Sequence, residues 1–253
     1  MHIDLHGKKI LVTGASRGIG KAIARHALLA GAKVGIHYAK SQQTALEFKE
    51  EFPHQAVPLQ ADLSLSGSVF RLFEESIEAL DGLDVLINNA GVAIHSPLNG
   101  EDTQWLDHWH TTLNTNLLAS CILSRKAVEY FLSQKQTGRI VHIASRAAFR
   151  GDTPDYLAYA ASKGGMVALS HSLARAYGKQ GIMSFVVAPG FTQTDMAQHF
   201  MQEYGEAHAL KDIALNKLTQ PEDIAPVVLL MAGGYLDHAT GTTVHINAGS
   251  YAH

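Results

Sequence analysis

Short apolar runs rich in β-branched residues alternate along the chain with longer amphipathic stretches. Runs with the length and composition of strands lie at Lys9–Thr13, Lys33–His37, Ala56–Gln60, Val85–Asn88, Arg139–Ala144, Ile182–Ala188 and Thr243–Ile246. Because parallel strands need a long crossover, which a helix usually supplies, this alternation predicts repeated βαβ units around a parallel sheet of seven strands.

Helical patterns fill the gaps between these runs. The clearest are Ile19–Ala30, Ser66–Leu80, Trp105–Leu132, Tyr156–Tyr177 and Pro221–Ala232. No linker, charge block or internal repeat divides the 253 residues, so we expect one domain over residues 1–253. The expected fold class is α/β, a single Rossmann-type doubly wound domain whose seven-stranded parallel sheet is flanked by helices on both faces. The least regular segment, around 191–217, is expected to be a mobile lid over a site.

Composition narrows the function class. With 46% hydrophobic and 17% charged residues, the chain resembles ordinary globular proteins, and a net charge of -3 gives no basic face for nucleic acid. Residues 1–9 lack the apolar core of a signal peptide, and Val227–Ala232 is too short to span a membrane. The lone Cys121 cannot form an internal disulfide and is expected to be a buried structural thiol. We therefore expect a cytoplasmic protein with no nucleic-acid, membrane or metal partner.

Three glycines, Gly14, Gly18 and Gly20, directly follow the first predicted strand, and a helical pattern starts at once. A strand, a glycine turn and a helix N-terminus together present backbone amides and a positive dipole to a pyrophosphate. Gly14 permits the tight turn, while Gly18 and Gly20 allow close approach of phosphate and helix. This segment predicts a dinucleotide-binding turn.

The Gly-xxx-Gly-x-Gly spacing resembles that of the short-chain dehydrogenase/reductase family. Asp62-Leu63 resembles the family's adenine site, and Asn88-Asn89-Ala90-Gly91 resembles its NNAG motif. The resemblance covers Lys8 to Gly249 and is greatest for the 3-oxoacyl-[acyl-carrier-protein] reductase branch. It implies cofactor contacts at Gly14, Ser16, Arg17, Gly18, Ile19, Gly20, Tyr38, Asp62, Leu63, Asn89, Ala90, Gly91, Tyr159, Lys163, Pro189, Gly190, Thr192 and Thr194.

The end of the second strand bears on the choice between NAD and NADP. NAD-binding relatives usually carry a carboxylate at the position of Tyr38, which holds the ribose hydroxyls. Without it a 2′-phosphate is not repelled, and Arg17 resembles the basic residue that pairs with this phosphate in NADP-dependent members. Lys40 either assists or is a solvated loop residue. NADP(H) is therefore favoured over NAD(H).

Tyr159 and Lys163 are four residues apart on a predicted helix, so their side chains share one face. Hydride reduction of a ketone leaves an alkoxide that needs a proton, and a phenol can supply it. A neighbouring ammonium is expected to favour the phenolate and to lower the pKa of the tyrosine. The pair resembles the family's YxxxK signature, in which the lysine also binds the nicotinamide ribose.

Two further residues complete the expected catalytic set. Ser145 ends a strand at the carboxyl edge of the sheet, where it resembles the family serine that hydrogen-bonds the substrate oxygen. Asn116 resembles the helix asparagine that holds a water linked to the lysine, although Asn114 is a competing position. Thr192 and Thr194 resemble the segment that contacts the nicotinamide carboxamide.

These residues predict an oxidoreductase that moves hydride between NADP(H) and a carbonyl or alcohol; the alternative is a catalytically silent NADP-binding sensor or scaffold. Specificity is expected from His95, Arg146, Phe149, Arg150 and the 191–217 segment. Arg146 and Arg150 either clamp a substrate carboxylate or phosphate or are solvated. The basic residues that dock the carrier in the resembling branch fall at Gln136 and Gln180 here, beside Lys135 and Lys179. Small residues in Tyr156–Tyr177 predict a homotetramer, or else a dimer, paired through the two long helices.

Overall fold

The computed structural model describes residues 3–194, 210 and 212–251. Seven strands form one parallel sheet in the order β3-β2-β1-β4-β5-β6-β7. They are β1 (Lys9–Val12), β2 (Lys33–Tyr38), β3 (Ala56–Gln60), β4 (Val85–Asn88), β5 (Gly138–Ile143), β6 (Ile182–Pro189) and β7 (Thr243–Ile246). The predicted seven-stranded parallel sheet is confirmed.

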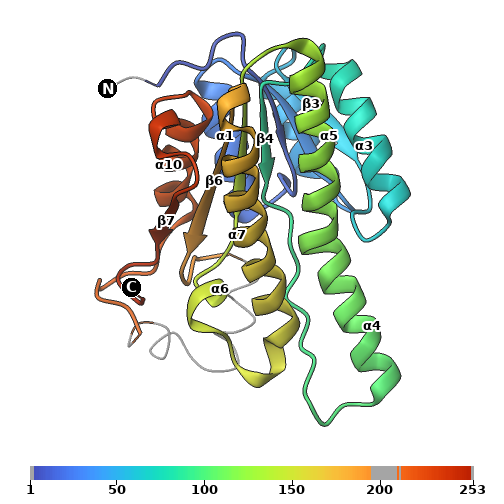
Figure 1. Cartoon of the computed structure of the whole chain (residues 1–253), viewed down its shortest axis with the longest axis vertical. Helices are drawn as coiled ribbons and strands as arrows, with labels where there is room; N and C mark the ends of the chain where they lie inside the picture. Colours follow the sequence, from blue (N-terminus) through green and yellow to red (C-terminus); the bar gives the residue numbers. More distant parts are fainter. Residues whose placement is uncertain (1–2, 195–209, 211, 252–253) are drawn as a thin grey trace.

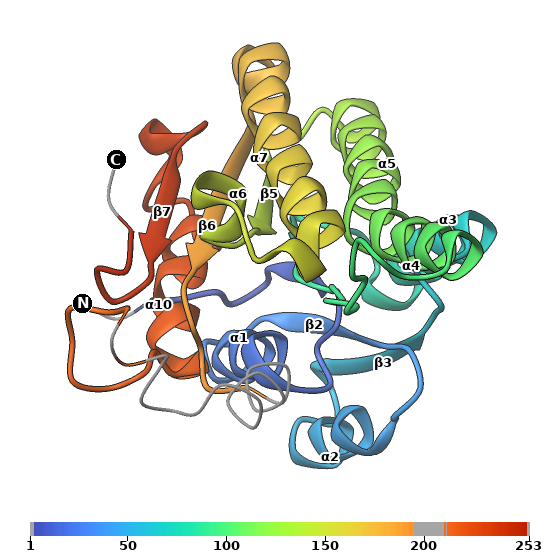
Figure 2. The ribbon, with the colours of Figure 1, turned by 90° about the horizontal axis from the view of Figure 1, so that it is seen from below.

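Helices cover both faces of this sheet (Figures 1 and 2). One face carries α1 (Gly18–Leu29), α2 (Gln43–Glu51) and α10 (Pro221–Ala232), and the other carries α3 (Ser66–Leu80), α5 (Ala119–Gln134) and α7 (Leu157–Tyr177). Every residue of the central strands β5 and β6 is buried. Covering on both sides explains why β6, with the sequence IMSFVVAP, is an almost continuous apolar run rather than an alternating one.

The long helix expected over Trp105–Leu132 consists of three parts. These are α4 (Asp102–Leu113), the π-helical turn η1 (Asn114–Leu118) and α5. The Glu101 carboxylate caps the start of α4 by accepting from the backbone N–H groups of Thr103 and Gln104. Single π-turns within α-helices are frequent at functional sites, and this one carries Asn116.

The sequence patterns did not predict several short elements. Besides α2, these are the helix α6 (Ala147–Arg150) and the 3₁₀ turns η2 (Pro154–Tyr156), η3 (Gly178–Gln180) and η4 (Asp237–Ala239). Elements of three or four residues are too short to show a helical period.

The strand order reverses between β1 and β4, because β2 and β3 extend to one side and β4 to β7 to the other. In open parallel sheets this reversal leaves a crevice at the carboxyl ends of the strands, where ligands bind. Most of the expected lid lies outside the described residues, since 195–209 and 211 belong to it. The lid and the single-domain organisation therefore stay predictions.

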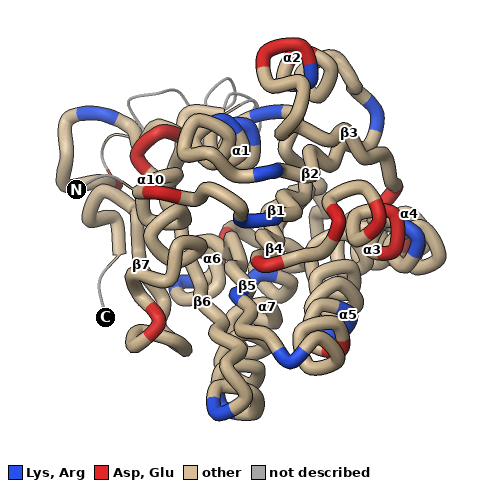
Figure 3. Tube along the Cα trace, turned by 90° about the horizontal axis from the view of Figure 1, so that it is seen from above, with Lys and Arg blue, Asp and Glu red and all other residues tan. Residues whose placement is uncertain are grey.

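Charged residues of both signs are interspersed over many elements (Figure 3). In the part of the chain that is described, the longest and most apolar helices fall short of what a membrane crossing requires.

Candidate active site

The glycine turn between β1 and α1 is built so that only glycine fits at its closest contacts. Gly14 has φ +64°, and a Cβ there would lie 2.9 Å from the backbone of Ala90. A Cβ on Gly20 would overlap the Gly14 carbonyl oxygen and the Asn89 amide. This cradle of bare backbone at a helix N-terminus fits the pyrophosphate of a dinucleotide.

Two side chains, one directly after β4 and one on β2, hold the turn in place from either side of β1. The Asn89 Nδ2 group donates to the carbonyl oxygens of Thr13 (2.8 Å) and Gly14 (3.0 Å). On the other side, the backbone N–H of Gly14 donates to Nδ1 of His37 (2.9 Å), whose Nε2 lies 3.1 Å from the Ala61 carbonyl oxygen. His37 is buried, and burial lowers its pKa to about 4, so the ring is neutral and can accept this bond.

A groove of about 440 Å³ runs from this turn across the carboxyl ends of the strands. Of the expected cofactor residues, it brings together Gly14, Ser16, Arg17, Gly18, Ile19, Gly20, Asp62, Leu63, Asn89, Ala90, Gly91, Tyr159, Lys163 and Thr194. Sequence reasoning missed other lining residues, among them His37, Ala39, Ser64, Thr111 and Thr115.

Tyr38 is an expected cofactor residue that the structure places elsewhere. Its side chain is 8% exposed and packs in the core cluster with α1 and α2, while the groove is lined by its neighbours His37, Ala39 and Lys40. Successive side chains of a strand point to opposite faces, and the sequence did not indicate which face Tyr38 takes.

Asp62 lies in the groove with its carboxylate partly engaged. Its Oδ1 accepts from the backbone N–H (2.9 Å) and the hydroxyl (2.7 Å) of Ser64. These bonds hold the pKa of Asp62 below its ordinary value, and Lys40 lowers it further. The side chain is thus an ionised acceptor at the expected adenine end.

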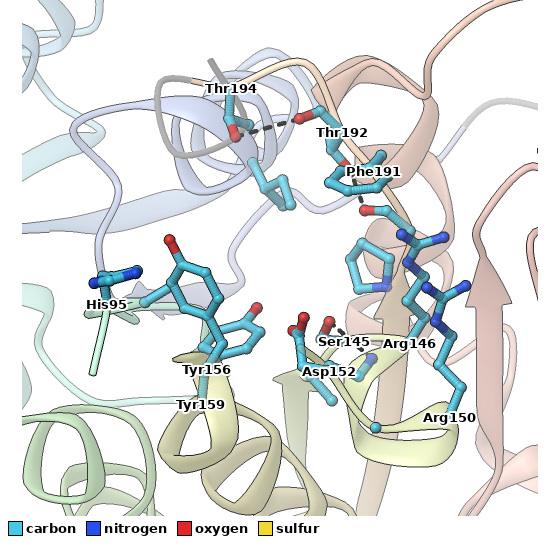
Figure 4. Close-up of a pocket in the computed structure, with 17 residues that line it drawn as sticks. His95, Ser145, Arg146, Arg150, Asp152, Tyr156, Tyr159, Phe191, Thr192 and Thr194 are labelled. Atoms are coloured by element: carbon cyan, nitrogen blue, oxygen red, sulfur yellow. Dashed lines mark hydrogen bonds between the residues drawn. The ribbon is translucent and has the colours of Figure 1, made fainter. Parts of the chain in front are cut away.

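A second cavity of about 490 Å³ adjoins the groove (Figure 4). It is lined by Ser145 and Tyr159, by Pro189 at the end of β6, and by the segment that follows, including Gly190, Thr192 and Thr194. Tyr159 lines both cavities. Its phenol therefore stands where a molecule in the second cavity would meet one in the glycine groove.

The environment of Tyr159 favours the protonated phenol. Burial raises its pKa, the Ser145 hydroxyl opposes this shift, and the negative charge of Asp152 adds to it. The expected lowering by Lys163 is not found. Lys163 Nζ lies 5.8 Å from the centroid of the Tyr159 ring and donates instead to the Ile143 carbonyl oxygen at 2.8 Å.

Lys163 is only 3% exposed, and burial lowers its pKa to about 8. Its other close contact is the Met166 sulfur at 3.5 Å. A Cβ added at Gly91 would lie 3.3 Å from Lys163 Nζ and 3.4 Å from Asn116 Oδ1. The ammonium and the asparagine amide thus converge on Gly91, at the floor of the groove.

Asn116 is fully buried in the π-turn, whereas the competing Asn114 is partly exposed. Its Oδ1 accepts from the backbone N–H of Val92 at 2.8 Å. Its Nδ2 donates to the Val92 carbonyl oxygen (2.9 Å) and the Ser162 hydroxyl (3.0 Å). These bonds connect α7 to the segment after β4, so Asn116 links the helix of Lys163 to the groove.

The expected specificity residues divide into two groups. His95, Arg146, Arg150 and the first part of the 191–217 segment line the second cavity, as do Asp152 and Tyr156, which sequence reasoning missed. Phe149 does not line it, because its ring packs against those of His245 (4.7 Å between centroids) and Tyr251 (6.4 Å). Phe149 and Arg150 are consecutive residues of the four-residue helix α6, so their side chains do not face each other.

The structure also shows the surroundings of Cys121 and Gln136, two residues that the sequence analysis singled out. Cys121 is partly rather than fully buried, and burial raises the pKa of its thiol. The Gln136 side chain donates to the Leu83 carbonyl oxygen at 2.6 Å, so it connects the turn before β5 to the segment before β4.

The chain is similar to known proteins over nearly its whole length. The family model described as Enoyl-(Acyl carrier protein) reductase matches residues 14–251. The chain is 32% identical over 253 residues to 3beta-hydroxysteroid dehydrogenase 1 of Eggerthella lenta, with 98% of this chain and 95% of that protein covered. It is 31% identical over 258 residues to the 3-oxoacyl-[acyl-carrier-protein] reductase FabG of Aquifex aeolicus, with 99% and 100% covered.

Among solved structures, a short chain dehydrogenase from Burkholderia cenocepacia in complex with NADP superposes with a TM-score of 0.88. It is 34% identical, and the match covers 98% of this chain and 99% of that one. The family model, the relatives and the fold of the solved structure agree over nearly the whole length. The chain belongs to the short-chain dehydrogenase/reductase family of oxidoreductases.

Proposed function

We propose that this protein is an NADP(H)-dependent oxidoreductase that transfers hydride between nicotinamide and a carbonyl or alcohol substrate. The observation that carries the proposal is the position of Tyr159, which lines both the glycine groove and the adjoining cavity. A proton donor at that junction serves a substrate whose carbonyl carbon faces the cofactor.

The bound nicotinamide would supply or accept the hydride. Tyr159 would give its proton to the oxygen that becomes the alcohol, and Ser145 would hold that oxygen by a hydrogen bond. Burial and the charge of Asp152 raise the pKa of Tyr159, so the residue is a proton donor at neutral pH.

Lys163 and Asn116 would act on the cofactor side. Lys163 Nζ lies beside Gly91 in the groove, where we propose that it binds the nicotinamide ribose. Asn116, held by Val92 and Ser162, is proposed to position the elements around that ammonium and a linked water.

Preference for NADP(H) is supported by Arg17, which is exposed on the glycine turn and lines the groove together with Lys40. A guanidinium binds a phosphate bidentately, which suits the 2′-phosphate. The Burkholderia relative in complex with NADP also supports it. Pro189, Gly190, Thr192 and Thr194 are proposed to contact the nicotinamide end.

The substrate is proposed to be a small or medium carbonyl compound, with a 3-oxoacyl thioester as one candidate because of the FabG relative. We also propose a cytoplasmic location, which the lone cysteine fits, and self-association to a homotetramer or dimer.

The test is NADPH oxidation by the purified protein with a panel that contains simple ketones, a steroid ketone, a 3-oxoacyl thioester and an enoyl thioester. We expect turnover of ketones and slower oxidation of NADH. Tight NADPH binding with no turnover of any member would favour the sensor alternative. Turnover of the enoyl compound alone would assign a different reduction.

A further inference from the structure

Two arginines lie in the wall of the cavity that contains Ser145: Arg146 directly follows this serine in the sequence, and Arg150 lies five residues after it. Arg146 is the N-cap of α6, and Arg150 is its last residue. Because they are four residues apart in one helical turn, with the Arg150 N–H donating to the Arg146 carbonyl oxygen at 3.1 Å, their side chains share one face. Figure 4 shows both guanidinium groups on the Phe191 side of the cavity.

Both guanidinium groups converge on a single carboxylate oxygen. Arg146 Nη1 donates to Asp212 Oδ2 at 2.6 Å, and Arg150 Nη1 donates to the same atom at 2.7 Å. The Arg146 guanidinium also lies over the Phe191 ring, with Cζ 4.3 Å from the centroid. The two arginines thus already bind a carboxylate in this structure, and Asp212 shows the chemistry of the ligand that they accept.

The partners differ in how much they depend on this contact. The Arg146 side chain is 9% exposed, and burial together with the neighbouring Arg150 lowers its pKa, while Asp212 raises it. Arg146 therefore requires an anion beside it. Burial raises the pKa of Asp212, but the two arginines more than offset this and hold it low. Because the Asp212 side chain is 36% exposed, it can turn to water while another carboxylate takes over its two hydrogen bonds.

Asp152 is the acidic group among the described residues that line the cavity. In Figure 4 its carboxylate lies beside Ser145, away from the guanidinium ends of Arg146 and Arg150. Its pKa is raised by burial, although the Thr153 backbone N–H and both arginines lower it. A chain that runs from the Ser145 oxygen site to the arginines would pass Asp152 before its charged end reaches them.

We propose that Arg146 and Arg150 bind a carboxylate carried by the substrate, which takes the place of Asp212, so that the enzyme acts on oxo acids or the corresponding hydroxy acids. This inference rests on the proposed function and deepens it by naming the substrate class. The competing account is that the three residues only tether the segment around Asp212 to α6.

The experiment compares substrates that differ only in charge. Rates with NADPH are measured for 4-oxopentanoate, 5-oxohexanoate and 6-oxoheptanoate, each against its methyl ester, in the wild type, Arg150→Gln and Arg71→Gln. Arg71 is an exposed arginine of α3 and serves as the charge-matched control. We expect kcat/KM of at least one acid to exceed that of its ester about tenfold, the size of one charge-assisted hydrogen bond. Arg150→Gln should move this ratio close to one, and Arg71→Gln should not.

Esters that react as well as acids in the wild type at every chain length would overturn the inference, whatever becomes of the variant. An equal loss for acid and ester in Arg150→Gln would assign the tether role and overturn it as well.

A binding measurement separates this inference from the proposed function. Hexanoate, but not hexanamide, should raise the melting temperature of the wild type with NADP⁺ present, and the increase should vanish in Arg150→Gln. That result without turnover of any ketone would leave the carboxylate site and reject the proposed function. Ketone turnover without any effect of hexanoate on the melting temperature would support the proposed function and reject the carboxylate site.

Discussion

The Nδ1 atom of His37 accepts a hydrogen bond from the backbone N–H of Gly14 at 2.9 Å, and this contact fastens the glycine turn to β2. The acceptor role requires a neutral ring. Burial lowers the pKa of His37 from 6.5 to about 4, while its bond to Ala61 opposes the shift. As the pH falls, His37 is therefore protonated in the unfolded chain at a higher pH than in the folded protein.

This difference makes stability depend on pH in a predictable direction. His37 stabilises the fold fully above pH 6.5, and the contribution is lost as the pH falls through about 4. Between these values its share of the slope approaches about 1.4 kcal/mol per pH unit. Urea unfolding at several pH values between 4 and 6.5 gives the free energy of unfolding, and its slope against pH should be shallower for His37→Asn than for the wild type. The exposed His54→Asn is the control, and equal slopes for all three proteins would contradict the prediction.

Tyr159→Phe removes the proton donor and keeps the ring. We expect kcat to fall roughly 100- to 10,000-fold, the usual contribution of a general acid, while the Kd for NADPH stays within about threefold. Steady-state kinetics and fluorescence titration measure the two quantities. Tyr235→Phe changes an exposed tyrosine in the same way and should have no effect. Near-normal turnover by Tyr159→Phe would show that Tyr159 is not the proton donor.

Lys163 should make cofactor binding sensitive to alkaline pH. Burial lowers its pKa to about 8, so the ammonium that is proposed to hold the ribose is lost as the pH rises above that value. We expect the Kd for NADPH to rise up to about tenfold per pH unit above 8. Lys163→Ala should bind weakly at every pH and turn over slowly. A Kd that is flat from pH 7 to 9 in the wild type would argue against the ribose contact, and a change in stability alone would leave Lys163 a structural residue.

Arg17→Ala should weaken NADPH more than NADH. Charge-assisted hydrogen bonds are worth about 1.5–3 kcal/mol, so we expect a loss of roughly ten- to 100-fold for NADPH and little for NADH. Arg25→Ala serves as the control, because Arg25 lies in α1, the helix that begins directly after Arg17, and pairs with Glu51. Equal losses for both cofactors would assign Arg17 a general phosphate or structural role.

A carboxylate at the end of β2 should shift preference in the same direction. From the sequence the position for it was Tyr38, but that side chain lies in the core. Ala39→Asp places the charge in the groove lining instead, and the ratio of NADPH to NADH affinity should fall.

These cases show which parts of the site the sequence could predict. Strands such as Val85–Asn88 were placed to the residue because a buried parallel strand is an apolar run between turn signals. The glycine turn was predicted from the strand before it and the helix after it, and the Tyr159–Lys163 pair from its spacing together with Ser145 and Asn116. Tyr38 and Phe149 were assigned to cavities although both pack elsewhere, since position in the sequence does not fix which face of a strand or short helix a side chain takes.

Contacts between distant segments lay beyond sequence reasoning. The Arg146–Asp212 pair joins residues 66 positions apart, and the Gly14–His37 bond joins residues 23 apart. Neither has a local pattern, because each arises only once the strands and loops are assembled at the carboxyl edge of the sheet.

The predicted homotetramer depends on which small residues of α7 face outward. Part of the expected set faces inward: a Cβ at Gly165 would overlap Leu117, and the Ser170 hydroxyl bonds Ser184 on β6 at 2.8 Å. In contrast, Ala161, Ala168 and Ser172 are exposed, and a Cβ at Gly164 would meet only the Ala148 carbonyl oxygen, at 3.9 Å. The outward-facing surface of small residues therefore includes only part of the set expected from the sequence, which was Ala160, Ala161, Gly164, Gly165, Ala168, Ser170 and Ser172.

Ala161, Gly164, Ala168 and Ser172 recur at intervals of three or four residues, so they form one stripe along α7 on which a second backbone can approach closely. The exposed Leu157 and Leu118, from α7 and η1, add apolar area that pairing would cover. Because α7 also carries Tyr159 and Lys163, pairing would brace the catalytic helix, and Ala168→Glu should reduce both assembly and activity. Ala79→Glu places the same charge on the exposed side of α3 and should change neither. Light scattering after size exclusion decides the matter, since a fully active wild-type species at the monomer mass of 27.3 kDa would refute the assembly.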